Sequence, residues 1–311
     1  MAVLLQFGLA ESTLAASCTV GVDALNFGNV DTLSGPPSNS TAQVSISCND
    51  VAATTTTVTV CGNFGAGSGG SAGNTRTMLS GAKTLNYQLF SDSGRSSPWG
   101  AYNNTALGQP QTIQVPASGG AAVGSVTLYG AVAAGQPDAA TGTYASTFAA
   151  PDASFYYQEG TALNCSAPTA AAVAQTSFAV QATVAANCLL SVNDINFGNH
   201  GVINSAVTAV GGVNVTCTPG TQYTIAIDGG LSGATNPEQR LMKSGTNTIA
   251  YGLYSDAAHT QPWSATGSGL VTGTSTSGGN MLTIPVYGRV EPQPVAVGQY
   301  SDTVVVTITY L

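Results

Sequence analysis

Charged side chains are scarce in this sequence. Only 6% of the 311 residues are Asp, Glu, Lys or Arg, against about 25% in an average soluble domain. The chain has six Lys and Arg residues in all and a formal net charge of -8. No basic stripe can therefore follow a phosphate backbone, and we expect no nucleic-acid partner and no anionic membrane surface as a partner.

Several chemical signatures are also missing. His200 and His259, the two histidines, have no Cys or acidic cluster near them in sequence, and the 14 acidic residues form no obvious catalytic pair. The Gly-rich run 65–70 matches a dinucleotide-binding pattern, but it lacks the following helix that this site needs, so we interpret it as a loop. We expect no enzyme activity, no cofactor and no metal. Without an apolar run of about 18 residues, we expect no transmembrane helix.

Cysteines are few but informative. Six are present, and no two form a C-x-x-C pair. An even number at wide spacing indicates disulfides and an oxidising compartment rather than a zinc site. The cysteines are Cys18, Cys48, Cys61, Cys165, Cys188 and Cys217.

The N-terminal segment 1–17 begins with a short apolar run and ends with small residues before Cys18. This pattern is typical of the end of a secretory signal, although the basic region is missing. We expect 1–17 to be the remnant of a signal peptide. The alternative is a strand that places Val3, Leu5, Phe7 and Leu9 on one face.

An internal repeat organises the rest of the chain. Cys18 is followed by Leu-Asn-Phe-Gly-Asn at 25–29, and Cys188 by Ile-Asn-Phe-Gly-Asn at 195–199. Further matches follow in the same order, which indicates a duplicated domain. We expect domains at 18–165 and 177–311, joined by a linker of small residues at 166–176.

The repeat also predicts the fold and the disulfides. Segments such as 56–60, 224–229 and 302–310 are rich in β-branched residues and are bounded by turn formers. We expect an all-β protein of two immunoglobulin-like β-sandwich domains. Because Cys18 and Cys48 match Cys188 and Cys217 in the repeat, each pair is expected to form one bridge, which leaves Cys61 to pair with Cys165.

The two halves end differently. The first continues past an expected strand at 141–148 into a tail, 149–165, that is able to supply one more strand. The second ends with its last strand, so we expect it to lack a strand and to expose a hydrophobic groove for a strand from another chain. The alternative is a shorter, self-sufficient domain. The expected groove residues are Val304, Val306, Ile308, Tyr310 and Leu311.

Three sequence blocks resemble a known family. They are Cys-x8-Phe-Gly, Tyr-x-Leu-[Phe/Tyr]-Ser-Asp before Pro-Trp, and the closing Gly-x-Tyr-x-Asp-Thr-Val pattern. Together they resemble the spore coat protein U domain, the pilin of archaic, Csu-type chaperone–usher pili. The resemblance covers nearly the whole chain twice and is strongest over 178–311.

The resemblance implies a two-domain tip adhesin, in which a binding domain precedes a pilin domain assembled by donor-strand complementation. It implies three partners: a periplasmic chaperone, an outer-membrane usher and the donor strand of the next subunit. It also implies secretion through the periplasm and an extracellular position at the pilus tip. The alternative is a non-adhesive pilus adaptor or a structural protein like a spore coat protein.

Counting antiparallel strands places three loops of the first domain at its far end, namely 50–54, 93–110 and 149–154. Their small apolar residues predict a patch that attaches to abiotic or host hydrophobic surfaces and supports biofilm formation. One alternative is that these residues pack inward, and another is a sugar pocket lined by Tyr102, Tyr156 or Asn103. The predicted patch residues are Val51, Ala52, Ala53, Ala101, Tyr102, Ala106, Leu107, Ala149, Ala150 and Pro151.

Overall fold

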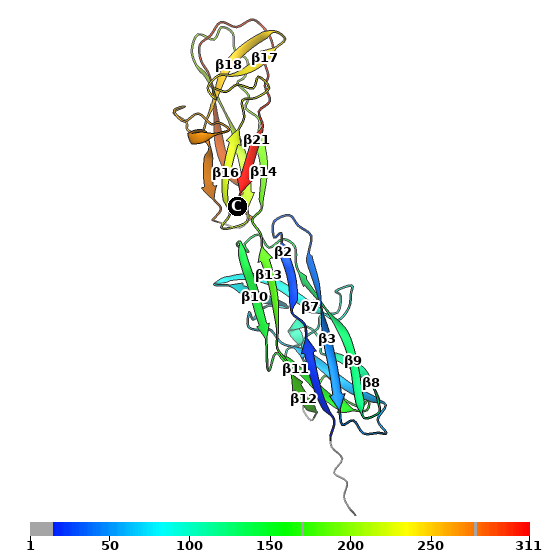
Figure 1. Ribbon diagram of the computed structural model, residues 1–311. Helices are drawn as coiled ribbons and strands as arrows, with labels where there is room; N and C mark the ends of the chain where they lie inside the picture. Colours follow the sequence, from blue (N-terminus) through cyan, green and yellow to red (C-terminus); the bar gives the residue numbers. More distant parts are fainter. Residues whose placement is uncertain (1–14, 169–170, 277–278) are drawn as a thin grey trace, which may run out of the picture. The chain divides into compact units, whose positions relative to one another are not determined.

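The computed structural model describes residues 15–168, 171–276 and 279–311 (Figure 1). Residues 1–14 of the expected signal-peptide remnant lie outside the described residues. The described chain is built from strands and two short 3-10 helices, and no helix in it is long and apolar enough to cross a membrane. The elements are β1 (Ser17–Val22), β2 (Leu25–Val30), β3 (Ser38–Asn49), β4 (Thr57–Phe64), β5 (Ser71–Ala72), β6 (Thr75–Ser80), β7 (Lys83–Phe90), η1 (Thr105–Leu107), β8 (Gln111–Ser118), β9 (Ala121–Val132), β10 (Gly142–Phe148), β11 (Ala153–Glu159), β12 (Ala172–Gln175), β13 (Phe178–Val184), β14 (Cys188–Asn193), β15 (Val207–Cys217), β16 (Gln222–Ile227), β17 (Arg240–Ser244), β18 (Asn247–Tyr254), η2 (Gly267–Gly269), β19 (Val271–Thr274), β20 (Leu282–Val290) and β21 (Val306–Tyr310).

The strands follow from alternating residues. In β3, Ala42, Val44, Ile46 and Cys48 are buried, while the Ser, Thr and Gln residues between them face outward. Such an alternation favours a sheet with one face on a hydrophobic core. The outward Ser and Thr residues supply the polar surface that the few charged residues do not.

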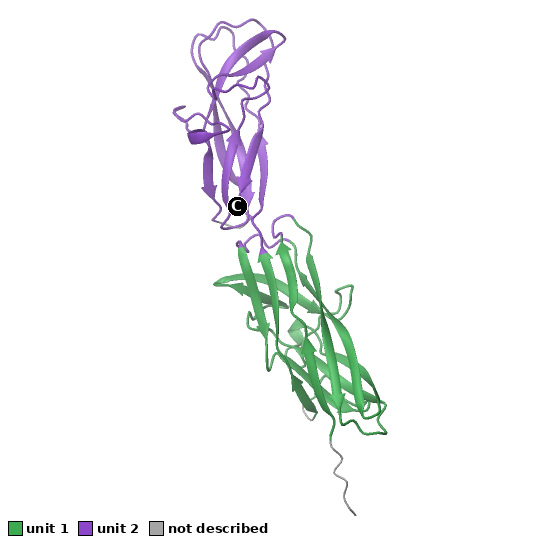
Figure 2. Cartoon of the chain, in the orientation of Figure 1, with its two compact units in different colours: residues 1–30, 35–134, 142–183 green, residues 31–34, 135–141, 184–311 purple. Residues whose placement is uncertain are grey.

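The described residues form two compact units (Figure 2), and the expected all-β architecture of two sandwich domains is confirmed. The first unit takes its residues from 1–30, 35–134 and 142–183, and the second from 31–34, 135–141 and 184–311. Two strands fall differently from the expected boundaries. The expected linker 166–176 contains β12, and β13 belongs to the first unit except for Val184.

The first unit is a sandwich whose strands are hydrogen-bonded in the order β12-β11-β4-β8-β9-β7-β6-β10-β13-β2, with β3 joining β1 to β9. Its core is aromatic. The Phe64 ring lies 4.9 Å from the Trp99 ring and 6.0 Å from the Phe148 ring, centroid to centroid. These contacts tie β4 and β10 to the loop that carries Trp99, which is buried as expected for a core residue.

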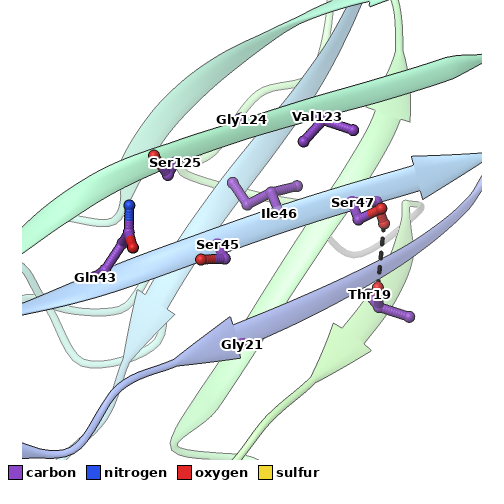
Figure 3. Close-up of a pocket in the computed structure, with 9 residues that line it drawn as sticks. All are labelled: Thr19, Gly21, Gln43, Ser45, Ile46, Ser47, Val123, Gly124 and Ser125. Carbon is purple, nitrogen blue, oxygen red and sulfur yellow. Dashed lines mark hydrogen bonds between the residues drawn. The ribbon is translucent and has the colours of Figure 1, made fainter.

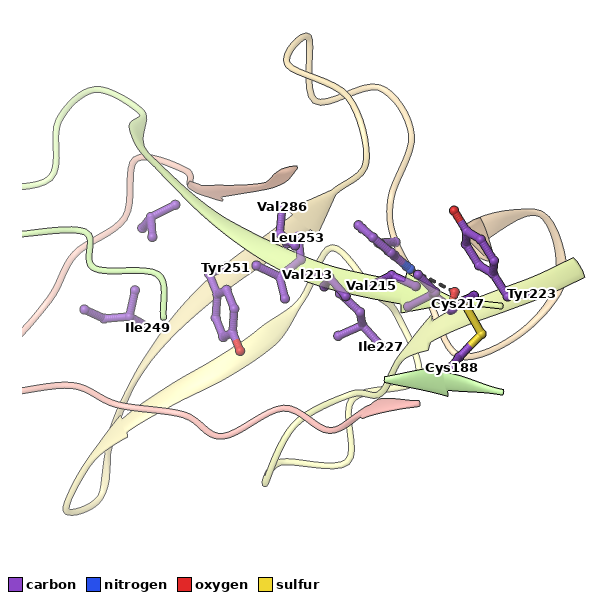
Figure 4. Close-up of a cluster of buried hydrophobic side chains, with 13 residues drawn as sticks. Cys188, Val213, Val215, Cys217, Tyr223, Ile227, Ile249, Tyr251, Leu253 and Val286 are labelled. Carbon is purple, nitrogen blue, oxygen red and sulfur yellow. Dashed lines mark hydrogen bonds between the residues drawn. A yellow bond between two sulfur atoms is a disulfide. The ribbon is translucent and has the colours of Figure 1, made fainter. Parts of the chain in front are cut away.

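The second unit has a five-stranded sheet, β14-β15-β20-β18-β17, and a three-stranded sheet, β19-β16-β21. Its buried cluster, drawn in Figure 4, includes Val213, Ile225, Tyr251 and Trp263. Trp263 donates its indole N–H to the Ile225 carbonyl, as Trp99 does to Gly62. The two units therefore share one core plan.

The three predicted disulfides are confirmed: Cys18–Cys48, Cys61–Cys165 and Cys188–Cys217. Cys18 lies directly opposite Cys48 on β1 and β3, and Cys188 lies directly opposite Cys217 on β14 and β15. The repeat-related bridges thus staple neighbouring strands within each unit.

A buried arginine holds each core loop in place. Arg76 donates to the carbonyls of Gly65, Phe64 and Trp99 at 2.6–2.8 Å. Arg240 repeats this in the second unit, with the carbonyl of Trp263 at 2.7 Å. Burial lowers the pKa of Arg76 to about 10, so its side chain stays charged at neutral pH. These guanidinium groups satisfy loop carbonyls that would otherwise be buried without partners.

We expect Arg76→Met to destabilise the first unit by about 3 kcal/mol, since each buried carbonyl left without a donor costs about 1–3 kcal/mol. Urea unfolding of the full chain, followed by Trp fluorescence, measures the change. Lys83→Met is the matched control, because Lys83 is exposed on the neighbouring strand β7. A loss below about 1 kcal/mol for Arg76→Met would contradict this role.

Candidate functional site

The segment from β12 to β13 closes the first unit. β12 pairs with β11 from Ser154 opposite Gln175 to Tyr157 opposite Ala172, and β13 lies between β10 and β2. Along β13, Phe178, Val180, Ala182 and Val184 are buried in alternation. The chain thus supplies the strand that covers this side of its own first core.

Phe178 anchors this strand. Its ring stacks on Phe148 with centroids 4.6 Å apart and meets Phe64 edge-on at 5.3 Å. Offset or edge-on aromatic pairs add about 0.5–1.5 kcal/mol to the free energy gained by burial. β13 is therefore an integral strand of the first core.

The extra strand differs from the one expected in the tail 149–165. β11 does form there, but it has a counterpart in the second unit. β11 pairs with β4, and β21 pairs with β16, which matches β4 because Gly62 and Ile225 both accept from the core Trp. The strand without a described counterpart is the β12–β13 segment, which the sequence analysis placed in the linker and the second domain.

The second unit has segments that match both neighbours of β13. Residues 195–200 correspond to β2, yet they form no strand. Residues 298–304 correspond to β10 and make one isolated bridge, between Ser301 and Lys243. In the first unit β2 is hydrogen-bonded to β13 alone among the described strands. The backbone groups of 195–200 thus lie where a strand like β13 would pair with them.

The core side chains beside this place are also more exposed in the second unit than in the first. In the first unit, the core residues beside β12–β13 are at most 8% exposed: Leu25, Phe27, Tyr144, Phe148, Ala153 and Phe155. Their counterparts in the second unit are all partly exposed: Ile195, Phe197, Tyr300, Val304, Val306 and Ile308. We call these six residues of the second unit the acceptor groove. Among the described strands, β21 pairs with β16 alone and so stands at the edge of its sheet.

The sequence analysis named three of these six residues, and whether they receive a strand from another chain stays a prediction. Val304, Val306 and Ile308 pack against the core, whereas Tyr310 is 37% exposed and Leu311 is 93% exposed. It missed Ile195, Phe197 and Tyr300. The signal for these was present, because the repeat aligns them with buried aromatic and aliphatic residues of the first unit.

The loops predicted to form one patch lie at opposite ends of β11. Gly65 N–H donates to Asp152 O, which places the loop 149–152 beside the end of β4. Ala52 N–H and the Thr55 hydroxyl donate to Glu159, at the other end of β11. A strand of this length separates the two loops by about 20 Å, so the prediction that they lie together is wrong.

The third loop, 93–110, lies at the same end as 149–152. Phe64 N–H donates to Gly100 O, and Tyr102 N–H donates to the Asn63 side chain. The error has a physical cause. The last long strand of the first sandwich is interrupted into β10 and β11, which pair in different sheets, so 149–152 lies at this interruption and not at an end of the unit.

The predicted patch residues differ in exposure. Val51, Ala101 and Leu107 are buried, as in the alternative that these residues pack inward, and Tyr102 is partly buried. The others are exposed: Ala52, Ala53, Ala106, Ala149, Ala150 and Pro151. Whether any of them contacts another surface stays a prediction.

The loop 50–56 shares its end of the first unit with 118–121 and 160–168. Val51 N–H donates to Gly120 O at 3.0 Å, and Gly160 N–H donates to Thr57 O at 2.8 Å. We call these three loops the end face. Its exposed residues are small or polar, and Asp50 is the charged residue within the three loops.

Tyr102 and Tyr156 meet on the surface of β11. Their ring centroids are 5.6 Å apart, and the rings are nearly perpendicular, at 86°. The contact between their hydroxyls, 3.5 Å apart, raises the pKa of Tyr156. Perpendicular rings do not present one flat platform for a sugar ring.

A shallow hollow of about 450 Å³ lies over the outer face of β1, β3 and β9 (Figure 3). None of its lining side chains is charged or aromatic, so it offers hydrogen-bonding groups without a group that would fix a particular ligand. The lining residues are Thr19, Gly21, Gln43, Ser45, Ile46, Ser47, Val123, Gly124 and Ser125.

Comparison with known proteins matches this chain to one family model and to several solved structures. The family model of the Spore Coat Protein U domain matches residues 4–150 and again 174–307. Comparison with curated protein sequences gave no match.

Among solved structures, a chain of the CsuC–CsuE chaperone–tip adhesion subunit complex, from archaic chaperone–usher Csu pili of Acinetobacter baumannii, is similar. It has 17% identity and a TM-score of 0.51, over 94% of this chain and 99% of that chain. The CupB6 tip adhesin of Pseudomonas aeruginosa has 12% identity and a TM-score of 0.35, over 95% and 93%. The similarity to the chain from the Csu pili supports a shared fold.

The open groove predicts a contrast in amide hydrogen exchange between matched segments. We expect the amides of 195–200 and 298–304 to exchange at least about 100-fold faster than those of β2 and β10. The reason is that the described part of the second unit has no strand that makes the hydrogen bonds which β13 makes to β2 and β10. Exchange followed by mass spectrometry on the full chain measures both sets at once. Equal protection would show that the second unit pairs these edges by itself.

Proposed function

We propose, on the premise that the chain belongs to the Spore Coat Protein U domain family, that it is a non-catalytic subunit of an extracellular chaperone–usher pilus. The observation that carries this proposal is the acceptor groove. The first unit covers the matching core with β12–β13, and the second has no described strand there. The second unit then takes its missing strand from another chain.

The physical gain from such a strand is large enough to drive assembly. Full burial of a Val, Leu, Ile or Phe side chain contributes about 1.5–3 kcal/mol, so completing the burial of each groove residue contributes about 1 kcal/mol. The added strand also pairs the free edge of β21 through backbone hydrogen bonds. We propose that a periplasmic chaperone supplies the strand first and that the next subunit replaces it after passage through an outer-membrane usher.

β13 serves as a template for that strand. Its inward positions carry Phe178, Val180, Ala182 and Val184. A donor for the acceptor groove is therefore expected to alternate apolar and polar residues and to carry no charge on its inward face. The polypeptide that fills the groove is thus specified by its side-chain pattern as well as by its backbone.

A completed first unit has no groove to accept a strand, which fits a position at the tip. We propose that the domain boundary of the pilin part follows β13 and that the first unit is the adhesive domain. The end face is its candidate contact surface, because the exposed Ala52 and Ala53 offer apolar contact with a solid, which contributes about 25 cal/mol per Å². The alternative is an adaptor that does not touch the surface.

A synthetic peptide of residues 172–184 tests the groove. We expect it to bind the full chain and to stabilise the second unit by about 2.7 kcal/mol at a peptide concentration of 100 Kd. Urea unfolding with and without peptide measures the gain. A peptide with Phe178→Asp and Val180→Asp is the control, because it places charge on the inward face. No difference between the peptides would contradict the acceptor groove.

Paired substitutions test the adhesive role. We expect Ala53→Asp, on the end face, to reduce attachment of piliated cells to polystyrene at least about 5-fold, because it places a charge in the apolar contact. Ala149→Asp is the matched control, since Ala149 is equally an exposed loop alanine but lies at the interruption between β10 and β11. Normal attachment of the Ala53→Asp strain, with pili assembled, would favour the adaptor.

A further inference from the structure

Two disulfides divide the first unit into closed loops. Cys18–Cys48 closes a loop of 30 residues, and Cys61–Cys165 closes one of 104 residues. A closed loop does not lengthen the covalent path through it when it unfolds. From β1 to the end of β13, the chain that remains free to stretch is therefore the segment 48–61, between the bridges, and the segment 165–184 after them.

The segment 165–184 includes β13, the strand by which the chain leaves the first unit at Val184. Tension from the second unit enters the first unit through this strand, because the covalent chain leaves the first unit there. β13 has neighbours on both sides, β10 and β2, so its backbone bonds and the buried Phe178 and Val180 resist the pull together. Behind β13, the chain runs through β12 to Cys165, which is held to β4 through Cys61.

We propose that the Cys61–Cys165 bridge is a mechanical stop for the first unit. Under tension β13 and β12 detach first, and the bridge limits that release to residues 166–184, a contour of about 70 Å. The strands that lie between Cys61 and Cys165 stay within one covalently closed loop. This inference does not rest on the proposed adhesive function, because it follows from the connectivity alone.

The limit on extension is large. With both bridges intact, the path between Ala15 and Ala186 has a contour of about 130 Å, and without them about 600 Å, at about 3.6 Å per residue. The bridges therefore shorten the maximum extension about five-fold. Loss of Cys61–Cys165 alone adds about 370 Å, and loss of Cys18–Cys48 alone adds about 110 Å.

Single-molecule pulling on the full chain tests the stop. Click-reactive residues at Ala15 and Ala186 place the load across the first unit and leave the second outside the load path. We expect a first step of about 70 Å and a total contour near 130 Å with the bridges intact. A first step of about 50 Å, the contour of segment 48–61, would show that this segment is released before β12 and β13 and would overturn the proposal.

The variant without the bridge carries Cys61→Ser and Cys165→Ser. We expect it to lengthen the total contour between Ala15 and Ala186 by about 370 Å. If this variant does not fold, a thiol reductant added to the extended wild-type chain gives the same step as each bridge is reduced. An unchanged length in both measurements would overturn the stop.

The order of release has its own control. Val180→Ala removes buried contact from β13 and is expected to lower the force of the first step. Val44→Ala removes similar contact from β3, inside the loop closed by Cys18 and Cys48, and is expected to leave the first step unchanged. Equal effects of the two substitutions would show that β13 does not detach first.

Discussion

The structure depends on the pairing of one β-strand at the open side of each sandwich. A sheet edge leaves a row of backbone groups unpaired, and a sandwich that lacks a strand also exposes the side chains beneath it. The first unit meets this requirement with its own β12–β13 segment, whose Phe178 stacks on Phe148. The second unit carries the same core plan, down to Trp263 and Arg240, without a described strand at that place. Within the described residues, this one difference in connectivity separates the two units.

The repeat keeps the same core contacts in both units. Arg76 and Arg240 each bind the carbonyl of the core Trp, and the paired bridges Cys18–Cys48 and Cys188–Cys217 staple the same two strands. The units differ in their third bridge. Cys61–Cys165, without a counterpart in the second unit, ties the segment before β12 to β4, which holds the closing strand close to the core that it covers.

Much of the fold was predictable from sequence because the repeat supplied an internal comparison. Matching Cys188 to Cys18 was enough to pair all the cysteines, and β-branched alternation was enough to predict the strands. Arg76 and Arg240 hold matching positions in the two repeats. The sequence does not show that they are buried, because an arginine in a strand usually faces solvent. The loop positions were not predictable, because they depend on where the last strand breaks into β10 and β11. Small residues at Ala149 and Ala150 do not reveal that this break lies inside the unit and not at its end.

Under the proposed assembly, the same connectivity gives the molecule a direction of growth. A strand donor for the first unit would have to displace β13, which is covalently continuous with the unit and therefore present at a very high effective concentration. A donor for the second unit displaces nothing within the described chain. Association is thus favoured at the acceptor groove and disfavoured at the first unit. In the proposed pilus, growth then proceeds from the acceptor groove, and the first unit needs no strand partner because β12–β13 already covers its core.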